Sequence, residues 1–266
     1  MVMKVAGIDI GELTTKVVIL EEGNILYHGI AITADKAEIA ARKAIEIALQ
    51  HTNLAMLDLS YVLATGMTRN GVSFANDTKT IITCLAKGVR RLFPDVRTVI
   101  DVGAESAAVF NIDGAGRVDS FTLNDKCGAG SGVFLESMAK MLEMSIEDMV
   151  DEALRADKAV TISNTCTIFA EQEVLSYTFA VPPVPMAEIV AGIHESLASR
   201  IFGLAKRVRI VPEVVLCGGV AKNRAFVKSL NKRVESELLV PEEPQIISAL
   251  GAALLAAESA TVIKGN

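Results

Sequence analysis

Apolar and polar positions along this chain follow one pattern twice. Residues 7–23 read GIDIGELTTKVVILEEG, and residues 100–114 read IDVGAESAAVFNIDG. In both segments an apolar run that holds one Asp ends at a Gly, and a second apolar run follows after a few polar residues. The strand-like runs NILYHGIAI and GRVDSFTLN come next. Each copy therefore predicts a strand, a tight turn, a second strand, a hairpin and a third strand.

Helical spacing follows each copy. Residues 35–50 place their apolar side chains three and four positions apart, as an amphipathic helix does. After the second copy, helices are predicted over residues 131–142, over about 186–208, and from about 223 onward. A buried-strand run, Val214–Cys217, precedes the last of these. The small apolar residues of SALGAAL, 248–254, predict a tightly packed helix.

Two strand-rich units, each followed by helices, indicate an α/β fold built by duplication. We expect residues 1–94 together with about 245–266 to form the first half, and residues 95–244 to form the second. Folds of this kind bind ligands in a crevice at the strand ends. The prediction is therefore a ligand cleft between the two halves.

Composition narrows the classes of function. The chain has 266 residues, of which 51% are hydrophobic, and a formal net charge of −6. An acidic chain without a basic tract is a poor nucleic-acid binder, and no apolar run reaches the length of a membrane span. The first residues lead straight into a strand-like run, with no signal peptide pattern. We expect a cytoplasmic protein that binds neither nucleic acid nor membrane.

The two Asp–Gly turns carry chemistry suited to a nucleotide. Gly11 and Gly103 would let backbone N–H groups approach phosphate oxygens. Asp9 can hold Mg²⁺ through waters, as hard cations prefer, and Asp101 has the same place in the second copy. A single such turn is equally an ordinary hairpin entry, but two copies favour a phosphate site. The candidate phosphate and metal contacts next to these turns are Glu12, Thr14, Thr15, Lys16, Ala104 and Glu105.

Two later glycine-rich segments fit the same site. Gly128-Ala129-Gly130-Ser131-Gly132 precedes a predicted helix, whose free N–H groups favour an anion. Gly218-Gly219 follows the buried strand, with Lys222 close behind. Each segment alone is explained as well by a flexible loop or by a strand-to-helix turn. Glu136, on the helix after the first segment, is either a nucleotide contact or an exposed carboxylate.

The chain has four cysteines, and their surroundings differ. Cys84 and Cys217 have apolar neighbours, which predicts core positions. Cys127 and Cys166 have polar, glycine-rich flanks at the starts of predicted helices, where the helix dipole stabilises a thiolate. Two thiolates cannot complete a [4Fe–4S] site, but a symmetric dimer would supply four. The alternative is that both are small buried side chains.

Several stretches together carry a family resemblance: GIDIGELTTK, ATGMTRN, IDVGAES, NDKCGAGSGVFLE, ISNTCTIFAEQEV, AGIHESLASR and CGGVAKN. The chain resembles the activator ATPases of 2-hydroxyacyl-CoA dehydratases and the ATP-binding subunits of benzoyl-CoA reductases. These belong to the superfamily of actin, heat-shock chaperones and sugar kinases. The resemblance implies duplicated actin-like (ribonuclease H-like) subdomains that bind ATP or ADP with Mg²⁺, with adenosine at Gly218 and Gly219.

The resemblance also implies an activity. Cys127 and Cys166 would bridge one [4Fe–4S] cluster between two subunits. ATP hydrolysis, with Asp9, Asp101 and Glu105 as catalytic residues, would drive an electron from ferredoxin or flavodoxin into a partner acyl-CoA dehydratase or reductase. Glu12 departs from the small hydroxyl residue usual in the family. Glu105 departs from the Gln of many activators, and the form GAES is closer to reductase subunits.

Three alternatives stay open from the sequence. The chain could be a permanent reductase subunit that pairs with a non-identical homologue in a heterodimer, rather than a separable activator that forms a homodimer. It could be a small-molecule kinase, although such an enzyme has no use for Cys127 and Cys166. It could also be a nucleotide-dependent assembly protein without enzymatic activity.

Overall fold

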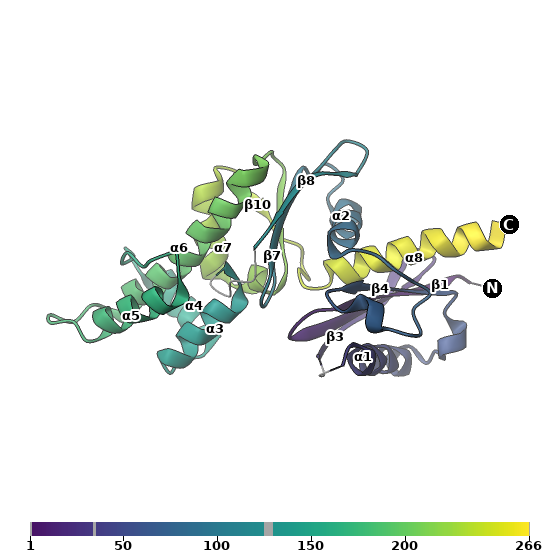
Figure 1. Ribbon diagram of the computed structural model, residues 1–266, viewed down its shortest axis with the longest axis horizontal. Helices are drawn as coiled ribbons and strands as arrows, with labels where there is room; N and C mark the ends of the chain where they lie inside the picture. Colours follow the sequence, from purple (N-terminus) through teal and green to yellow (C-terminus); the bar gives the residue numbers. More distant parts are fainter. Residues whose placement is uncertain (1, 34–35, 125–129, 266) are drawn as a thin grey trace. The chain divides into compact units, whose positions relative to one another are not determined.

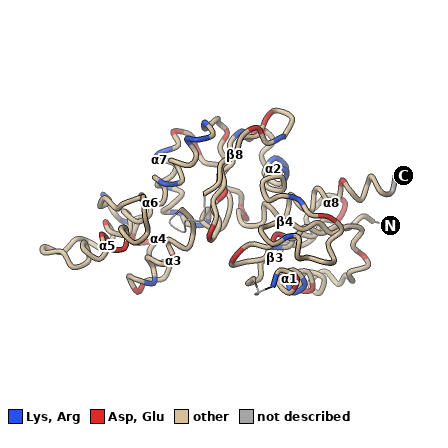
Figure 2. The backbone as a smooth tube through the Cα atoms, in the orientation of Figure 1, with Lys and Arg blue, Asp and Glu red and all other residues tan. Residues whose placement is uncertain are grey.

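The computed structural model describes residues 2–33, 36–124 and 130–265, and it divides into two compact units. Unit 1 comprises Met1–Val96, Ile112–Val118 and Gln245–Asn266, and unit 2 comprises Arg97–Asn111 and Asp119–Pro244. Each unit contains a five-stranded sheet with helices packed against it (Figure 1). Acidic and basic residues are both found along the backbone of each unit (Figure 2). In the described part of the chain, we find no helix that combines the length and the apolar character needed to cross a membrane.

The sheet of unit 1 has the strand order β3-β2-β1-β4-β5. The strands are β1 (Lys4–Ile10), β2 (Thr14–Glu21), β3 (Asn24–Ile32), β4 (Tyr61–Gly66) and β5 (Asp77–Thr78). The first three pair antiparallel, and β4 and β5 continue the sheet in parallel. The helices are α1 (Ala37–Thr52), α2 (Ile81–Leu92) and α8 (Ile247–Gly265).

Helices cover both faces of β1, which explains its almost unbroken apolar sequence. Ala6, Ile8 and Ile10 pack with α1, whereas Val5 packs with α8. Because alternate residues of a strand point to opposite faces, both sets are buried. Glycine permits a very close approach of α8: a Cβ added at Gly7 would lie 2.2 Å from the carbonyl oxygen of Ala249. The predicted tightly packed helix is confirmed.

The sheet of unit 2 has the order β10-β9-β6-β7-β8. The strands are β6 (Thr98–Val102), β7 (Ala107–Ile112), β8 (Val118–Leu123), β9 (Val214–Cys217) and β10 (Leu238–Leu239). The helices are α3 (Gly132–Met141), α4 (Ile146–Arg155), α5 (Thr167–Thr178), α6 (Met186–Ala205) and α7 (Arg224–Val234). One core joins β6, through Ile100, to Phe134 of α3, Ile193 of α6 and Phe226 of α7.

The predicted duplication is confirmed at the level of single hydrogen bonds. In the β1–β2 turn, the Gly11 N–H donates to the carbonyl oxygen of Thr14 at 3.2 Å. In the β6–β7 turn, the Gly103 N–H donates to that of Ser106 at 2.8 Å. The repeat extends further than its sequence pattern, because β4 lies parallel to β1 just as β9 lies parallel to β6. Two hairpins, each with an added parallel strand, make an α/β fold of two related halves.

Helices α2 and α4 were not predicted. Both begin at a capping residue of a type that the sequence already indicates. The Thr80 hydroxyl accepts a hydrogen bond from the Thr83 N–H, and the Ser145 hydroxyl accepts one from the Asp148 N–H. Helices commonly begin at a Ser or Thr whose hydroxyl accepts a hydrogen bond from the backbone N–H three residues later.

Candidate functional site

Asp9, at the end of β1, has the most unusual environment of the predicted site residues. It is only 3% exposed. Its Oδ2 accepts a 2.7 Å hydrogen bond from the Ser248 hydroxyl, and the Lys16 Nζ lies 3.7 Å from the same oxygen. Its Oδ1 is buried and accepts no hydrogen bond from any described residue. A buried carboxylate oxygen without a partner is costly, so this position fits a hydrated Mg²⁺.

Lys16 is folded back over the turn that follows Asp9. Its Nζ donates to the carbonyl oxygen of Thr14 at 3.0 Å. A Cβ placed on Gly11 would lie 2.9 Å from this nitrogen, so the absence of a side chain at Gly11 leaves room for the ammonium group. Thr14 and Glu12 are half-buried beside it. The turn therefore combines a fixed positive charge, a buried carboxylate and polar groups within one short segment.

Thr15 differs from its neighbours in its burial and in the face of β2 on which it lies. It is fully buried, and its hydroxyl lies 3.0 Å from the hydroxyl of Thr33, which in turn donates to the carbonyl oxygen of Gly11 at 2.9 Å. Successive residues of a strand point to opposite faces, so Thr15 faces away from the side that Thr14 and Lys16 share. In this structure Thr15 joins the turn to the residue that follows β3, through Thr33. Sequence reasoning missed Thr33 and Ser248, whose roles depend on distant parts of the chain.

The equivalent turn of unit 2 has a different charge. Asp101 is half-buried at the end of β6, and it lies across from Ala108 in the strand register, where Asp9 lies across from Lys16. Glu105 is exposed in the turn. The two turns have the same backbone hydrogen bond. In the strand register, Asp9 lies across from a lysine and Asp101 lies across from an alanine.

The start of α3 is attached to the Asp101 turn. The Gly132 N–H donates to the carbonyl oxygen of Gly103 at 2.9 Å, and the Val133 N–H donates to that of Ala104 at 2.8 Å. The backbone N–H of Gly132 is therefore already used within unit 2. Gly130 and Ser131 are buried, and Glu136 is exposed on α3. The predicted contacts Gly128 and Ala129 lie outside the described residues.

The Gly218 loop repeats a feature of unit 1. Gly218 follows β9 with a φ of +87°, and a Cβ there would lie 2.3 Å from the carbonyl oxygen of Val102. Gly66 is the last residue of β4 and has a φ of +101°, and a Cβ there would lie 2.2 Å from the carbonyl oxygen of Ile10. A 3₁₀ turn, Gly219–Lys222, comes next, and the Lys222 ammonium pairs with Glu243 at 2.9 Å. Only glycine combines this conformation with so close an approach to the strand that bears the Asp.

The described cysteines separate into two classes. Cys84 and Cys217 are fully buried, as predicted. Burial raises the pKa of Cys84 to about 11, and burial with the nearby Asp101 carboxylate raises the pKa of Cys217 well above its usual value. Cys166 is half-buried and is the N-cap residue of α5. Cys127 lies outside the described residues, and the described residues contain no group of three or more His, Cys, Asp or Glu side chains that could hold a metal ion.

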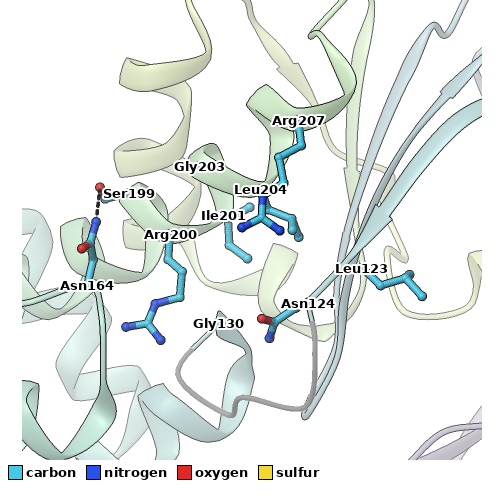
Figure 3. Close-up of a pocket in the computed structure, with 10 residues that line it drawn as sticks. All are labelled: Leu123, Asn124, Gly130, Asn164, Ser199, Arg200, Ile201, Gly203, Leu204 and Arg207. Carbon is cyan, nitrogen blue, oxygen red and sulfur yellow. Dashed lines mark hydrogen bonds between the residues drawn. The ribbon is translucent and has the colours of Figure 1, made fainter.

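Contacts from α6 hold the loop that leads to Cys166. The Ser196 hydroxyl donates to the carbonyl oxygen of Ser163 at 2.8 Å, and the Asn164 side-chain amide donates to the Ser199 hydroxyl at 2.9 Å. A cavity of about 360 Å³ lies beside this loop. Figure 3 shows two arginines at its wall: Arg200 of α6 and Arg207 of the 3₁₀ turn Lys206–Val208 that follows α6. Cys166 is thus positioned by the start of α5 and by two hydroxyls of α6.

The chain is similar to known proteins over almost its whole length. The 2-hydroxyisocaproyl-CoA dehydratase activator of Clostridioides difficile is 37% identical over 258 residues, which cover 97% of this chain and 96% of that protein. A benzoyl-CoA reductase subunit of Thauera aromatica is 30% identical, with coverages of 94% and 91%. The solved structure of the activator of the 2-hydroxyisocaproyl-CoA dehydratase from Clostridium difficile, with bound ADPNP, superposes with a TM-score of 0.93 at 36% identity. It covers 99% of this chain and 97% of that one.

These likenesses confirm the predicted fold class, α/β with duplicated actin-like subdomains, and they extend over almost the whole chain. The model of the BadF/BadG/BcrA/BcrD ATPase family matches residues 6–256. That match contains both Asp turns, the Gly218 loop and Cys166. The chain therefore belongs to the BadF/BadG/BcrA/BcrD ATPase family.

Proposed function

We propose that this chain is an ATP-hydrolysing iron–sulfur protein that drives a low-potential electron into a partner enzyme acting on a 2-hydroxyacyl-CoA. The observation that carries the proposal is the state of Cys166. It is a partly accessible thiol at a helix N-terminus, in the unit that also contains the Asp101 turn and the Gly218 loop. An ATPase that only transfers phosphate has no need of such a cysteine.

In this proposal both units contribute to ATP binding. Lys16 and Thr14 in unit 1 contact phosphate oxygens, and Gly103 and Ala104 supply the corresponding turn in unit 2. Gly218 and Gly219 contact the adenosine, with Lys222 at the end of the loop. Glu105, exposed in its turn, is available to orient the attacking water. Phosphoryl transfer depends mainly on positioning and on neutralisation of charge, which these groups supply.

The residues around Asp9 fit Mg²⁺. Its buried Oδ1 needs a partner, and Ser248 and Lys16 hold the opposite oxygen in place. When bound, Mg²⁺ would neutralise charge on the transferring phosphate. Asp101 supplies a second carboxylate in unit 2. Lys16 also keeps the local charge near balance, which offsets the added carboxylate of Glu12.

Cys166 fits a [4Fe–4S] cluster better than the other described cysteines do. Cys166 is the N-cap residue of α5, so the backbone N–H groups in the first turn of this helix favour a negatively charged group beside it. Cys84 and Cys217 are fully buried within their units and do not fit. The second ligand of this chain is Cys127, by the family resemblance. When bound, the cluster would supply one-electron transfer at low potential.

Two chains are needed for four thiolates, so the proposal includes a dimer. Apolar side chains near Cys166 support contact with another protein: Ile168 and Phe169, in the first turn of α5, are 61% and 58% exposed. Exposed apolar groups beside a functional residue are typical of interaction sites. The electron donor is ferredoxin or flavodoxin, and the acceptor is an acyl-CoA dehydratase or reductase.

A separable activator is favoured over a permanent reductase subunit. The dehydratase activator is 37% identical to this chain, and the benzoyl-CoA reductase component is 30% identical. Glu105 is the residue that points toward the reductase branch. The two roles differ in purification, since a permanent subunit stays with its partner and an activator separates from it.

The test is anaerobic purification, followed by iron and sulfide analysis and an electron paramagnetic resonance spectrum of the reduced protein. We expect about four irons per two chains, which is one cluster per dimer. Cys166→Ser and Cys127→Ser should each lose the iron and keep ATP binding. Cys84→Ala is the matched control, because it removes a buried thiol and should keep the iron. A colourless protein that still hydrolyses ATP would contradict electron transfer.

A further inference from the structure

His194 is the one fully buried histidine of the described residues, and the proposed reaction does not use it. It lies in the middle of α6 with no exposed surface. Its Nδ1 lies 2.8 Å from the carbonyl oxygen of Val190, and its Nε2 lies 3.1 Å from the side-chain nitrogen of Asn223. The Oδ1 of Asn223 accepts a 2.9 Å hydrogen bond from the Phe226 N–H. Four residues thus form one connected chain of hydrogen bonds: Val190 and His194 of α6, Asn223 at the N-cap of α7, and Phe226 of α7.

The direction of each hydrogen bond follows from its ends. A carbonyl oxygen can only accept, so the Val190 oxygen requires a proton on Nδ1 of His194. The Phe226 N–H can only donate, so the Asn223 oxygen faces it and the Asn223 nitrogen faces the imidazole. That nitrogen can only donate, and Nε2 must accept. The imidazole is therefore neutral, and its two neighbours determine which nitrogen carries the proton. Burial lowers the pKa of His194, which also favours the neutral ring.

Asn223 ends the loop that begins at Gly218. Its backbone N–H donates to the carbonyl oxygen of Val220 at 3.0 Å, which closes the 3₁₀ turn, and its side chain caps α7. At the other end of the loop, the Gly218 N–H donates to the carbonyl oxygen of Pro244 at 2.9 Å. The loop is held at two points. One is a backbone contact, and the other is a side chain whose orientation depends on His194.

We propose that His194 is a positioning residue for the nucleoside-binding loop Gly218–Lys222, acting through Asn223. By accepting from the Asn223 amide, it keeps the capping oxygen of Asn223 on α7 and so sets the position at which the loop ends. This inference rests on the proposed binding of adenosine at Gly218 and Gly219. It adds a residue that touches no part of the nucleotide but sets the affinity of the site for it.

Two substitutions at the same buried position separate this role from a structural one. His194→Gln keeps an oxygen near the place of Nε2, which can accept from Asn223, and it gives up the bond to Val190. His194→Asn keeps a donor near the place of Nδ1 for Val190, and it gives up the bond to Asn223. Each substitution removes one hydrogen bond and the imidazole ring. If His194 had only a structural role, the two variants would therefore change nucleotide affinity equally. The proposal predicts that only His194→Asn weakens the loop.

The measurement is the dissociation constant of ATP and of ADP by isothermal titration of the full chain, with the melting temperature recorded for each variant. We expect His194→Asn to raise both dissociation constants about tenfold, and His194→Gln to leave them within about threefold of the starting protein. Both variants should melt at similar temperatures. Asn223→Ser, which keeps a capping oxygen but is too short to reach His194, should behave like His194→Asn.

The outcomes separate this inference from the function on which it rests. Equal affinities in His194→Asn and His194→Gln, with both folded, would overturn the positioning role and leave ATP binding intact. If the unsubstituted chain bound no ATP, the proposed function itself would fail. If one variant does not fold, Asn223→Ser supplies the same comparison from the other end of the hydrogen bond.

Discussion

The Ser248 hydroxyl donates a 2.7 Å hydrogen bond to Oδ2 of Asp9, although 239 positions separate the two residues in the chain. Ser248 lies in the first turn of α8, and Asp9 lies near the end of β1. This contact, with Lys16 near the same oxygen, leaves Oδ1 as the buried carboxylate oxygen that accepts no hydrogen bond from any described residue. The last helix of the chain thereby orients the first acidic residue of the proposed site.

Ser248→Ala should change the response of the ATPase to Mg²⁺. Without the hydroxyl, the carboxylate of Asp9 loses its fixed rotamer, and we expect the Mg²⁺ concentration for half-maximal ATP hydrolysis to rise about tenfold. The free energy of unfolding should fall by about 1–3 kcal/mol, as for other buried hydrogen bonds. The matched control is Ser196→Ala, which removes a buried hydroxyl bonded to Ser163 in unit 2. An equal shift in Mg²⁺ dependence in both variants would contradict the role of Ser248.

Gly218→Ala should destabilise the protein and weaken nucleotide binding. The φ of +87° is strained for alanine, and the added Cβ would lie 2.3 Å from the Val102 carbonyl oxygen. Strain of this kind costs about 1–3 kcal/mol before the steric clash is included. Urea unfolding measures the change. The control Gly203→Ala, where a Cβ meets no described atom within 4 Å, should be neutral or raise the free energy of unfolding by up to about 1 kcal/mol, as expected for Gly→Ala in a helix.

The partly exposed cysteine should react with a thiol reagent in the native protein, and the two buried cysteines should not. In cluster-free Cys127→Ser protein at neutral pH, Cys166 should react quickly with a maleimide, because it is half-buried at a helix N-terminus. Cys84 and Cys217 should react only after denaturation, since burial raises the pKa of both thiols and excludes the reagent. Mass spectrometry of the labelled protein counts the sites. Rapid labelling of Cys217 in the native state would show that β9 is not enclosed as described.

Stability should decrease in mild acid because of His194. Burial lowers the pKa of His194 in the folded state below its ordinary value of 6.5. Between the two pKa values the unfolded chain binds more protons, so the free energy of unfolding is at its full value above pH 6.5 and declines as the pH falls below it. Urea unfolding at a series of pH values measures this slope. His194→Gln, which cannot titrate, should flatten it, and an unchanged slope in that variant would assign the effect to other groups.

Short-range features of the site were predictable from sequence. The Gly11 and Gly103 turns depend on bonds to residues three positions later, so neighbouring residues are enough to specify them. The burial of Cys84 and the helix start at Cys166 also follow from adjacent residues. Strand alternation could have excluded Thr15 from the side that Thr14 and Lys16 share, because a period of two places it on the opposite face.

Long-range features were beyond sequence reasoning. The occupied N–H of Gly132 depends on Gly103, and the duplicated role of Gly66 and Gly218 depends on which strands pair in parallel. The link from His194 to Asn223 joins two separate helices. None of these pairs leaves a periodic signal, since their contacts form only when distant segments pack together.

By itself, the sequence determined the duplicated hairpins, the class of the fold and the residue types of the site, because turns and periodic burial are local properties of a chain. Only the tertiary structure decided how those residues are used. It brought the Ser248 hydroxyl within hydrogen-bond distance of Asp9, and it buried Thr15. It also left Cys166 partly exposed, whereas Cys84 and Cys217 are fully buried. Burial and hydrogen-bond partners come from segments that meet in space, and these set which groups are free to bind and react.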